Sequence, residues 1–255
     1  MASNIEVKVR VATPELIEKT SVDIQNFLLR KIGYYKSRYE KYEAKLALGH
    51  LSRQREREYR LLAAKYRQKL AEVEVYREGD YKDVVRRFLI YGESVIKEYP
   101  LFLRNAIRKY VNMNIKNKKC SVEFFEDSIE IIHGGSVTVI FSAENLDDIK
   151  RYTYSEYKGI DTYIYFIILL MFGILSSIIT AYGYTVEGQI TLLEVLCYTV
   201  MFGAIPMLIG SLGLMYLKKT TYIVVTTNDE KIIIITSRSI EDTEEIYYRL
   251  ANLKR

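Results

Sequence analysis

The chain has few of the residues from which most catalytic and metal sites are built. Its 255 residues include two histidines, two cysteines and no tryptophan. His50 and His133 stand alone, whereas a zinc or acid–base site needs partner residues at a fixed spacing. The sequence has no glycine-rich phosphate loop, no dinucleotide-binding fingerprint and no Gly-x-Ser-x-Gly elbow. We therefore predict that the protein is not an enzyme and has no catalytic residue, no metal and no cofactor.

Neither the cysteines nor the N-terminus indicates an oxidising compartment. Cys120 precedes a predicted strand and Cys197 lies in a long apolar run, so we expect no disulfide between them. Residues 1–14 are polar and charged, without the apolar stretch of a secretory signal. The abundance of Lys, Glu and Ile, beside 23 tyrosines, is typical of a thermophile.

Two long uncharged runs follow one another in the second half of the chain. There are 25 uncharged positions between Asp161 and Glu187, and 23 between Glu194 and Lys218. A helix needs about 20 apolar residues to cross the ~30 Å hydrocarbon layer of a membrane. The sequence therefore predicts a transmembrane helical hairpin over residues 161–218.

Basic residues flank both runs and are missing from the segment between them. Lys150, Arg151 and Lys158 precede the first run, and Lys218 and Lys219 follow the second. Cytoplasmic loops carry an excess of Lys and Arg, so these residues are expected to set the topology. We predict an integral membrane protein with two spans and both termini cytoplasmic.

Small residues recur within the two runs at spacings that suit close helix packing. They are Gly173, Ser177 and Ala181 in the first run and Gly203, Gly210 and Gly213 in the second. Small residues let two helix backbones approach each other. The pattern favours packing of the two helices on each other, and homo-oligomerisation is the alternative.

The N-terminal part predicts a pair of long helices. Residues 1–12 alternate as a short strand or an extended arm would, and Thr13-Pro14-Glu15 is a helix start. Ser52 is placed to cap a second helix after the glycine at position 49. Heptad-like spacing in both helices predicts an antiparallel, coiled-coil-like hairpin. The seam residues are Leu28, Ile32, Tyr35, Tyr39, Tyr42 and Leu46, then Tyr59, Leu62, Tyr66, Val73 and Tyr76.

The net charge of +5 is unevenly distributed along the chain. Residues 1–115 carry 24 Lys and Arg against 15 Asp and Glu, whereas residues 116–255 carry 13 against 17. A basic patch at the start of the second helix consists of Arg53, Arg55, Arg57 and Arg60. Such a patch fits contact with phosphate groups of nucleic acid or lipid. Because Glu56 and Glu58 are interleaved, a solvated helix start with local ion pairs is the simpler interpretation.

From residue 120 the apolar period changes from helical to two. Residues 121–125, 128–133 and 136–141 are predicted strands, residues 149–157 a further strand or a connector, and residues 221–226 and 231–236 a second hairpin. Gly134-Gly135 suits a two-residue turn, and Ser239 suits the cap of a final helix over residues 240–253. The predicted domains are a basic helical domain at 1–115, a split β module at 116–160 and 219–255, and the hairpin at 161–218. The fold class is α+β.

The order of these elements resembles a family of uncharacterised small membrane proteins. Their pleckstrin-homology-like β module is interrupted by a two-helix transmembrane hairpin. The resemblance covers residues 120–255 and rests on element order and on two strand patterns. These are Ser121-Val122-Glu123-Phe124-Phe125 and Tyr222-Ile223-Val224-Val225-Thr226. It implies a layout and assigns no functional residue.

The function expected from the sequence is that of a membrane-anchored, non-enzymatic adaptor or scaffold. It would present the helical arm and the β module to a protein partner. One alternative is a membrane tether for nucleic acid or another anionic surface, as in a virion. The other is a subunit of an oligomeric pore or transport complex. Membrane lipid, a protein partner or a second copy are the expected partners, and no small-molecule substrate is evident.

Overall fold

The structure is a computed structural model, and it describes residues 5–153, 160–187, 197–219, 221–237 and 239–254. Side chains are described for these residues except at 160–163, 181, 183–187 and 216–219. The chain divides into two compact units. One comprises residues 1–12, 88–97 and 116–255, and the other comprises residues 13–87 and 98–115.

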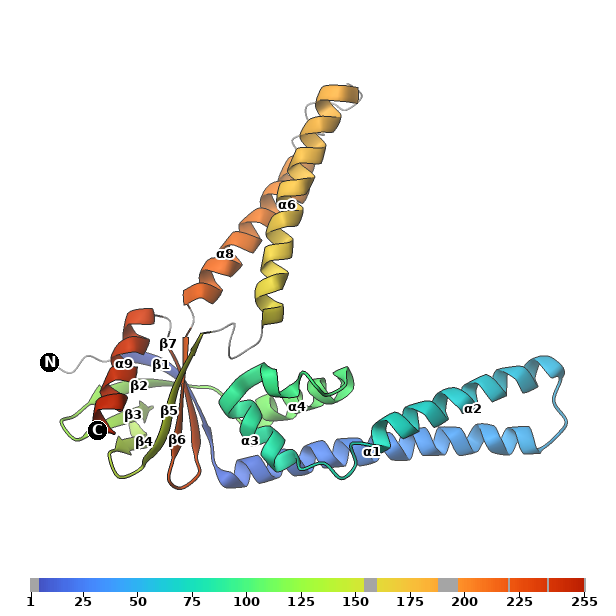
Figure 1. Cartoon of the computed structure of the whole chain (residues 1–255), viewed down its shortest axis with the longest axis horizontal. Coiled ribbons are helices and arrows are strands. Elements are labelled where there is room, and N and C mark those ends of the chain that lie inside the picture. Colours follow the sequence, from blue (N-terminus) through green and yellow to red (C-terminus); the bar gives the residue numbers. More distant parts are fainter. Residues whose placement is uncertain (1–4, 154–159, 188–196, 220, 238, 255) are drawn as a thin grey trace. The chain divides into compact units, whose positions relative to one another are not determined.

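The first unit is built on a seven-stranded antiparallel sheet in the order β4-β3-β2-β1-β7-β6-β5 (Figure 1). The strands are β1 (Ile5–Ala12), β2 (Lys118–Phe124), β3 (Ser128–His133), β4 (Ser136–Ser142), β5 (Leu146–Thr153), β6 (Thr221–Thr227) and β7 (Ile232–Ser237). The sheet therefore joins strands from three distant parts of the sequence, and the fold class is α+β.

The N-terminal segment is a central strand of this sheet. Buried and exposed side chains alternate along β1, with Ile5, Val7 and Val9 buried. Val9 lies opposite Lys118 of β2 and Ile235 of β7, so β1 connects the two halves of the sheet. Residues 5–12 thus belong with the strands and not with the helices that follow them.

Turn and cap residues act where the sequence predicts. Gly134 and Gly135 join β3 to β4 with φ angles of 59° and 81°, the positive values that a two-residue hairpin turn of this kind requires. The hydroxyl of Ser239 accepts a hydrogen bond from the Asp242 amide at 3.5 Å and caps α9 (Ile240–Leu253). These residues confirm the predicted β hairpin and the predicted helix start.

The main core of the first unit lies between one face of the sheet and α9 (Figure 1). Ile246 and Leu250 of α9 are fully buried there, together with Val122, Ile131 and Phe141 of the sheet. Burial of such apolar side chains supplies about 25 cal/mol for each Å² removed from water. The core is therefore made almost entirely of branched aliphatic side chains.

Strands β5 and β6 pair although a long insertion separates them in the sequence. Ile149 of β5 lies opposite Val225 of β6. The described part of the insertion contains α6 (Ile160–Glu187), a π-helical segment η2 (Thr199–Ala204) and α8 (Ile205–Lys219). α6 and α8 pack against each other.

The membrane assignment is overturned. None of the helices is, over its described residues, both long enough and apolar enough to cross a membrane. The predicted transmembrane hairpin over 161–218 and the predicted two-span localisation with cytoplasmic termini are therefore wrong.

The second unit consists of helices. It contains α1 (Pro14–Ala47), α2 (Arg53–Glu74), the first part of α3 (Tyr81–Tyr91) and α4 (Leu101–Asn114), while the 3₁₀ helix η1 (Gly92–Ile96) belongs to the first unit. The buried residues of α1 all lie in its first half, from Ile17 to Leu28. α1 and α2 run antiparallel as the predicted hairpin, and α4 packs on the first half of α1.

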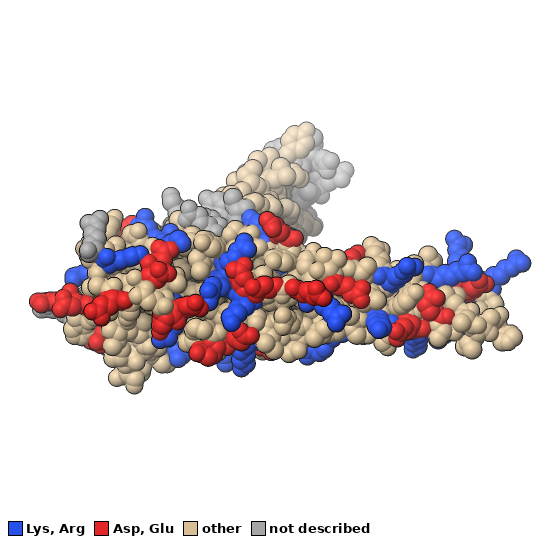
Figure 2. Space-filling view, turned by 60° about the horizontal axis from the view of Figure 1, so that its bottom comes forward, with Lys and Arg blue, Asp and Glu red and all other residues tan. Residues whose placement is uncertain are grey.

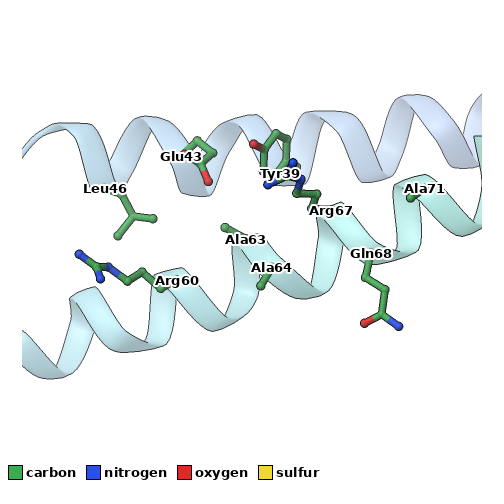
Figure 3. A pocket seen from close by; sticks show the side chains of 9 residues that line it. All are labelled: Tyr39, Glu43, Leu46, Arg60, Ala63, Ala64, Arg67, Gln68 and Ala71. Atoms are coloured by element: carbon green, nitrogen blue, oxygen red, sulfur yellow. The ribbon is translucent and has the colours of Figure 1, made fainter.

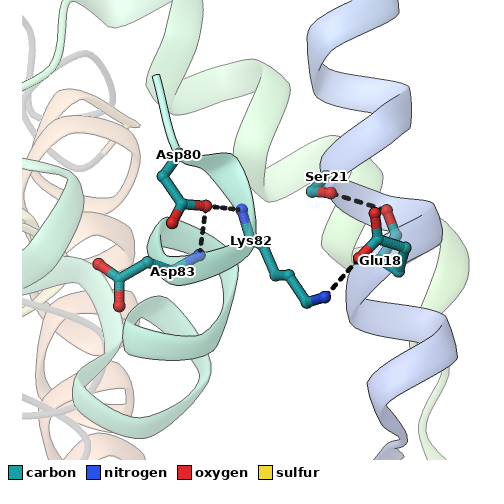
Figure 4. A network of polar contacts seen from close by, with 5 residues as sticks. All are labelled: Glu18, Ser21, Asp80, Lys82 and Asp83. Atoms are coloured by element: carbon teal, nitrogen blue, oxygen red, sulfur yellow. Dashed lines mark hydrogen bonds and ion pairs between the residues drawn. The ribbon is translucent and has the colours of Figure 1, made fainter. Parts of the chain in front are cut away.

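A polar network ties the start of α3 to α1 (Figure 4). The Asp80 carboxylate accepts hydrogen bonds from the amides of Lys82 and Asp83 at 3.0 and 3.1 Å, which caps α3. Lys82 then forms an ion pair with Glu18 of α1, with 2.6 Å between Nζ and the carboxylate oxygen. This surface ion pair joins the start of α3 to the first half of α1.

Candidate functional site

Tyrosine rings hold the outer parts of α1 and α2 together, and nearer the start of the hairpin Arg30 and Lys31 of α1 also contact Tyr110 and Phe102 of α4. Tyr42 stacks on Tyr66 with ring centroids 5.8 Å apart and an interplanar angle of 11°. Tyr42 also contacts Tyr59 at 5.8 Å, and Tyr35 contacts Tyr66 at 6.3 Å. Such aromatic pairs contribute about 0.5–1.5 kcal/mol beyond their area burial. The seam is therefore aromatic and half-exposed, unlike an aliphatic coiled coil.

Cations lie over several of these rings. The Lys45 ammonium is 4.9 Å from the Tyr59 ring centroid, and Lys69 is 5.8 Å from that of Tyr35. Desolvation in the seam raises the pKa of the Tyr66 phenol above its ordinary value. The rings attract the lysines through their quadrupoles and leave the positive charge of the lysines in place.

We define the distal hairpin as residues 30–70, the part of α1 and α2 that ends at the connecting turn. It carries 13 Lys and Arg against 4 Asp and Glu, a net charge of +9. Figure 2 shows lysine and arginine side chains gathered at the end of the hairpin, with few acidic residues among them. Of residues 29–72, Ala63 alone is buried. The distal hairpin is therefore a strongly basic surface with almost no core.

A groove runs along the distal hairpin and continues to Ala71 (Figure 3). It has a volume of about 470 Å³. Its lining consists of Tyr39, Glu43 and Leu46 from α1 and of Arg60, Ala63, Ala64, Arg67, Gln68 and Ala71 from α2. Leu46 points from α1 toward α2 in Figure 3, and Ala63 is only 3% exposed. The hollow exists because α2 presents alanines where a larger side chain would fill it.

Two rows of residues on α2 repeat every seven positions along the groove. Arg53, Arg60 and Arg67 form one row, which we call the arginine row. Arg57, Ala64 and Ala71 form the neighbouring row. A seven-residue repeat keeps a helix face toward a partner helix. The tyrosine seam uses the same repeat on the adjacent face, so α2 offers one face to α1 and a second face to solvent.

The predicted basic patch lies at the turn end of this surface. The side chains of Arg53, Arg55 and Arg57 are exposed, and Arg60 pairs with Glu56 at 2.6 Å. Both partners of this pair are largely exposed, so the pair contributes little to stability. Sequence reasoning missed Arg67 and the alanines, although the seven-residue step from Arg53 through Arg60 leads directly to Arg67.

The small residues predicted for helix packing lie between α6 and α8. A methyl group added at Gly173 would come 2.7 Å from the Gly203 carbonyl oxygen, and one at Gly210 would come 2.8 Å from the Leu170 amide nitrogen. Gly203 faces Ser177, and Gly213 faces the Phe166 ring. The side chain of Ala181 lies outside the described residues. Larger residues at these glycines would push the two helices apart.

The residues predicted to set topology lose that role with the two spans. Lys150 pairs with Asp148 at 2.6 Å, and this ammonium lowers the pKa of the Asp148 carboxyl. Arg151 pairs with Glu244 of α9 at 3.1 Å. Lys158 lies outside the described residues, as do the side chains of Lys218 and Lys219. Lys150 and Arg151 thus take part in surface ion pairs of the first unit.

Histidine and cysteine residues form no cluster in the described parts of the chain. Nδ1 of His133 lies 2.7 Å from the Lys119 carbonyl oxygen, and His50 is exposed in the turn between α1 and α2. Both cysteines are free, and burial raises the pKa of the Cys120 thiol. The described residues include no group of three His, Cys, Asp or Glu side chains that could hold a metal ion.

Comparisons with known proteins do not indicate a function for this chain. No protein-family model, no curated protein and no solved structure matches this chain. Of the surfaces described above, the distal hairpin combines high charge, a groove and a repeating pattern. We therefore treat it as the candidate functional site.

Proposed function

We propose that this protein is a non-enzymatic adaptor that binds a protein partner through its distal hairpin. The observation that carries the proposal is the distal hairpin itself, two helices with a net charge of +9 and one buried side chain between residues 29 and 72. Such a hairpin adds little core, so its length is not explained by the stability of the helical unit. A long, charged and largely unburied helical surface is suited to association with a complementary partner.

In such an adaptor the sheet unit would support the distal hairpin. It has a large aliphatic core closed by α9, which holds its strands in a fixed arrangement. The resemblance of its strand order to an interrupted pleckstrin-homology-like module stays a prediction, as does the absence of catalysis. We infer that the sheet unit is a stable base and that the hairpin is the recruiting element.

A shortened hairpin tests this function while preserving the sheet. Removal of residues 32–45 and 56–69 takes two heptads from each helix and keeps the turn between them, so the seam can re-form. Deleting residues 1–115 would instead remove β1 from the centre of the sheet. The full chain and the shortened chain are used as baits in nuclease-treated extracts, with proteins identified by mass spectrometry.

The adaptor proposal predicts a stoichiometric protein that the full chain captures and the shortened chain does not. Circular dichroism and a thermal melt show that the shortened chain is folded. A partner that binds both chains equally would contradict the role of the distal hairpin.

Nucleic acid is a second candidate partner, because the same charge favours phosphate binding. In that case nuclease would remove the captured material. Duplex DNA would then bind the full chain at low salt and dissociate as salt is raised. No retention of duplex DNA at low salt would exclude this alternative.

A further inference from the structure

We propose that the groove between α1 and α2 binds an acidic amphipathic helix, which would complete a three-helix bundle; this inference rests on the proposed adaptor function. The groove and the two seven-residue rows beside it carry the argument.

The shape of the groove fits a helix. Ala64 and Ala71 are exposed, lie one heptad apart, and flank a floor formed by Ala63. Small side chains at this spacing let another helix approach to the 8–10 Å interaxial distance of ordinary helix packing. Leu46 and Tyr39 of α1 supply apolar surface on the other side of the groove. The incoming helix would therefore present a narrow stripe of small or aliphatic residues.

The charge of the groove specifies an acidic helix. Arg60 and Arg67 line it with one acidic residue, Glu43, and the arginine row extends to Arg53. Arg60 already pairs with Glu56, so Arg67 and Arg53 are the cations that a partner would meet first. Among the described residues, Arg67 takes part in no ion pair or side-chain hydrogen bond. A helix with glutamates beside its apolar stripe would place one carboxylate near each arginine, because its own residues also repeat every seven positions. From Arg53 to Ala71 the surface is about 27 Å long, which corresponds to a partner helix of about 18 residues.

The same features disfavour nucleic acid as the occupant of the groove. Single strands bind by stacking bases on exposed aromatic rings, whereas in the seam Tyr42 stacks on Tyr66 and Tyr35 lies tilted against Tyr66. Phosphate contacts also need no apolar floor between the basic residues. An acidic amphipathic helix would contact the alanines with its apolar stripe and the arginines with its carboxylates.

The probe for this proposal is a synthetic peptide of three heptads. It carries alanine and leucine on one stripe and glutamate on both sides of that stripe, with lysine replacing every glutamate in the control peptide. Binding to the full-length protein is followed by fluorescence anisotropy at physiological salt. We expect saturable binding of the glutamate peptide and at least about tenfold weaker binding of the lysine peptide, about 1.4 kcal/mol. Equal binding of both peptides, or no binding of the glutamate peptide, would overturn the proposal.

Two exposed cations on α2 provide a matched pair of variants. Arg67→Glu and Lys65→Glu change the net charge equally, but residues 65 and 67 lie about 160° apart around the helix. We expect Arg67→Glu to weaken binding of the glutamate peptide about tenfold or more, and Lys65→Glu to change it less than about threefold. Equal losses would mean that only the overall charge matters, and the groove assignment would fail.

A second pair tests the shape of the groove without changing any charge. Ala64→Leu fills the groove, while Ala44→Leu adds the same atoms to an exposed position of α1 outside the lining. Both are good helix formers, so neither change should unfold the hairpin. We expect only Ala64→Leu to weaken binding, and equal affinity of the two variants would contradict the groove.

These outcomes are separable from failure of the adaptor function. If the shortened hairpin loses a cellular partner but the glutamate peptide does not bind the full chain, the adaptor stands and the groove proposal falls. If the same cellular partner binds with and without the distal hairpin, the adaptor proposal itself falls.

Discussion

The sheet unit and the distal hairpin solve the problem of stability in opposite ways. The sheet unit packs apolar side chains from all seven strands, most of them isoleucine and valine, against α9, and most members of that core are at most 2% exposed. The distal hairpin has one buried alanine, and half-exposed tyrosine rings replace an aliphatic seam. A sheet with such a core tolerates few substitutions of its buried side chains. The distal hairpin is held together by partly solvent-exposed rings on one face, so its outer face can carry many charged residues. The difference indicates which part is the base and which part meets a partner.

Truncation of a core side chain in the sheet should have the largest effect. Phe141 of β4 is fully buried beside Ile129 of β3 and belongs to the core that contains α9. Phe141→Ala is expected to lower the free energy of unfolding of the sheet unit by about 3–5 kcal/mol, through lost transfer energy and a cavity. Urea denaturation measures the loss, and hydrogen exchange should show it in all seven strands. A loss below about 1 kcal/mol would mean that the core is not packed as described.

A seam tyrosine should matter less and only locally. Tyr66 contacts Tyr34, Tyr35 and Tyr42, so Tyr66→Ala removes the centre of the aromatic seam. The expected cost is roughly 1–2 kcal/mol, because each aromatic pair contributes about 0.5–1.5 kcal/mol. Hydrogen exchange should become faster in the distal hairpin and stay unchanged in the strands. Faster exchange in the sheet would break the contrast between the two regions.

A buried tyrosine at the base of the helical unit should give a small effect with a characteristic pH dependence. Tyr81 is 1% exposed and donates a hydrogen bond to the Tyr76 carbonyl oxygen, so Tyr81→Phe should cost about 1 kcal/mol. Burial, with smaller contributions from Tyr99 and Tyr76, raises the pKa of the Tyr81 phenol well above its ordinary value of 10. The folded state binds the phenolic proton more tightly than the unfolded state does. The resulting contribution to the free energy of unfolding is therefore fully present below about pH 10 and is lost as the pH rises further.

Denaturation of both proteins between pH 8 and pH 11 measures this effect. The wild-type protein should lose stability above pH 10 more steeply than Tyr81→Phe, because the other tyrosines are common to both. Parallel curves would show that Tyr81 titrates as an exposed tyrosine does.

The elements that the sequence predicts correctly are those whose ends are set by neighbouring residues. Thr13 and Ser52 cap α1 and α2 through hydrogen bonds from Leu16 and Arg55, at 3.4 and 3.5 Å, and both caps are recognisable as sequence patterns. The glycine pair at positions 134 and 135 is equally local, since only the φ angles of a two-residue turn are involved.

Long-range pairing and surface geometry explain the rest. The alternation in residues 5–12 fits a strand, but nothing nearby shows that β1 pairs with β7 more than 200 residues later. The two apolar runs are uncharged, yet over the described residues neither forms a helix that is both long enough and apolar enough to cross a membrane. The groove was missed because it depends on alanines, which carry no chemical signal until a neighbouring helix makes them the floor of a hollow.

Hydrogen exchange of the full chain, with and without the three-heptad glutamate peptide, tests the central claim most directly. The claim is that the distal hairpin receives a partner while the sheet unit serves as the base. We predict slower exchange confined to residues 39–46 and 53–71, where the groove and its two rows lie, and no change in strands β1–β7. Protection of the strands with none in the hairpin would contradict the account.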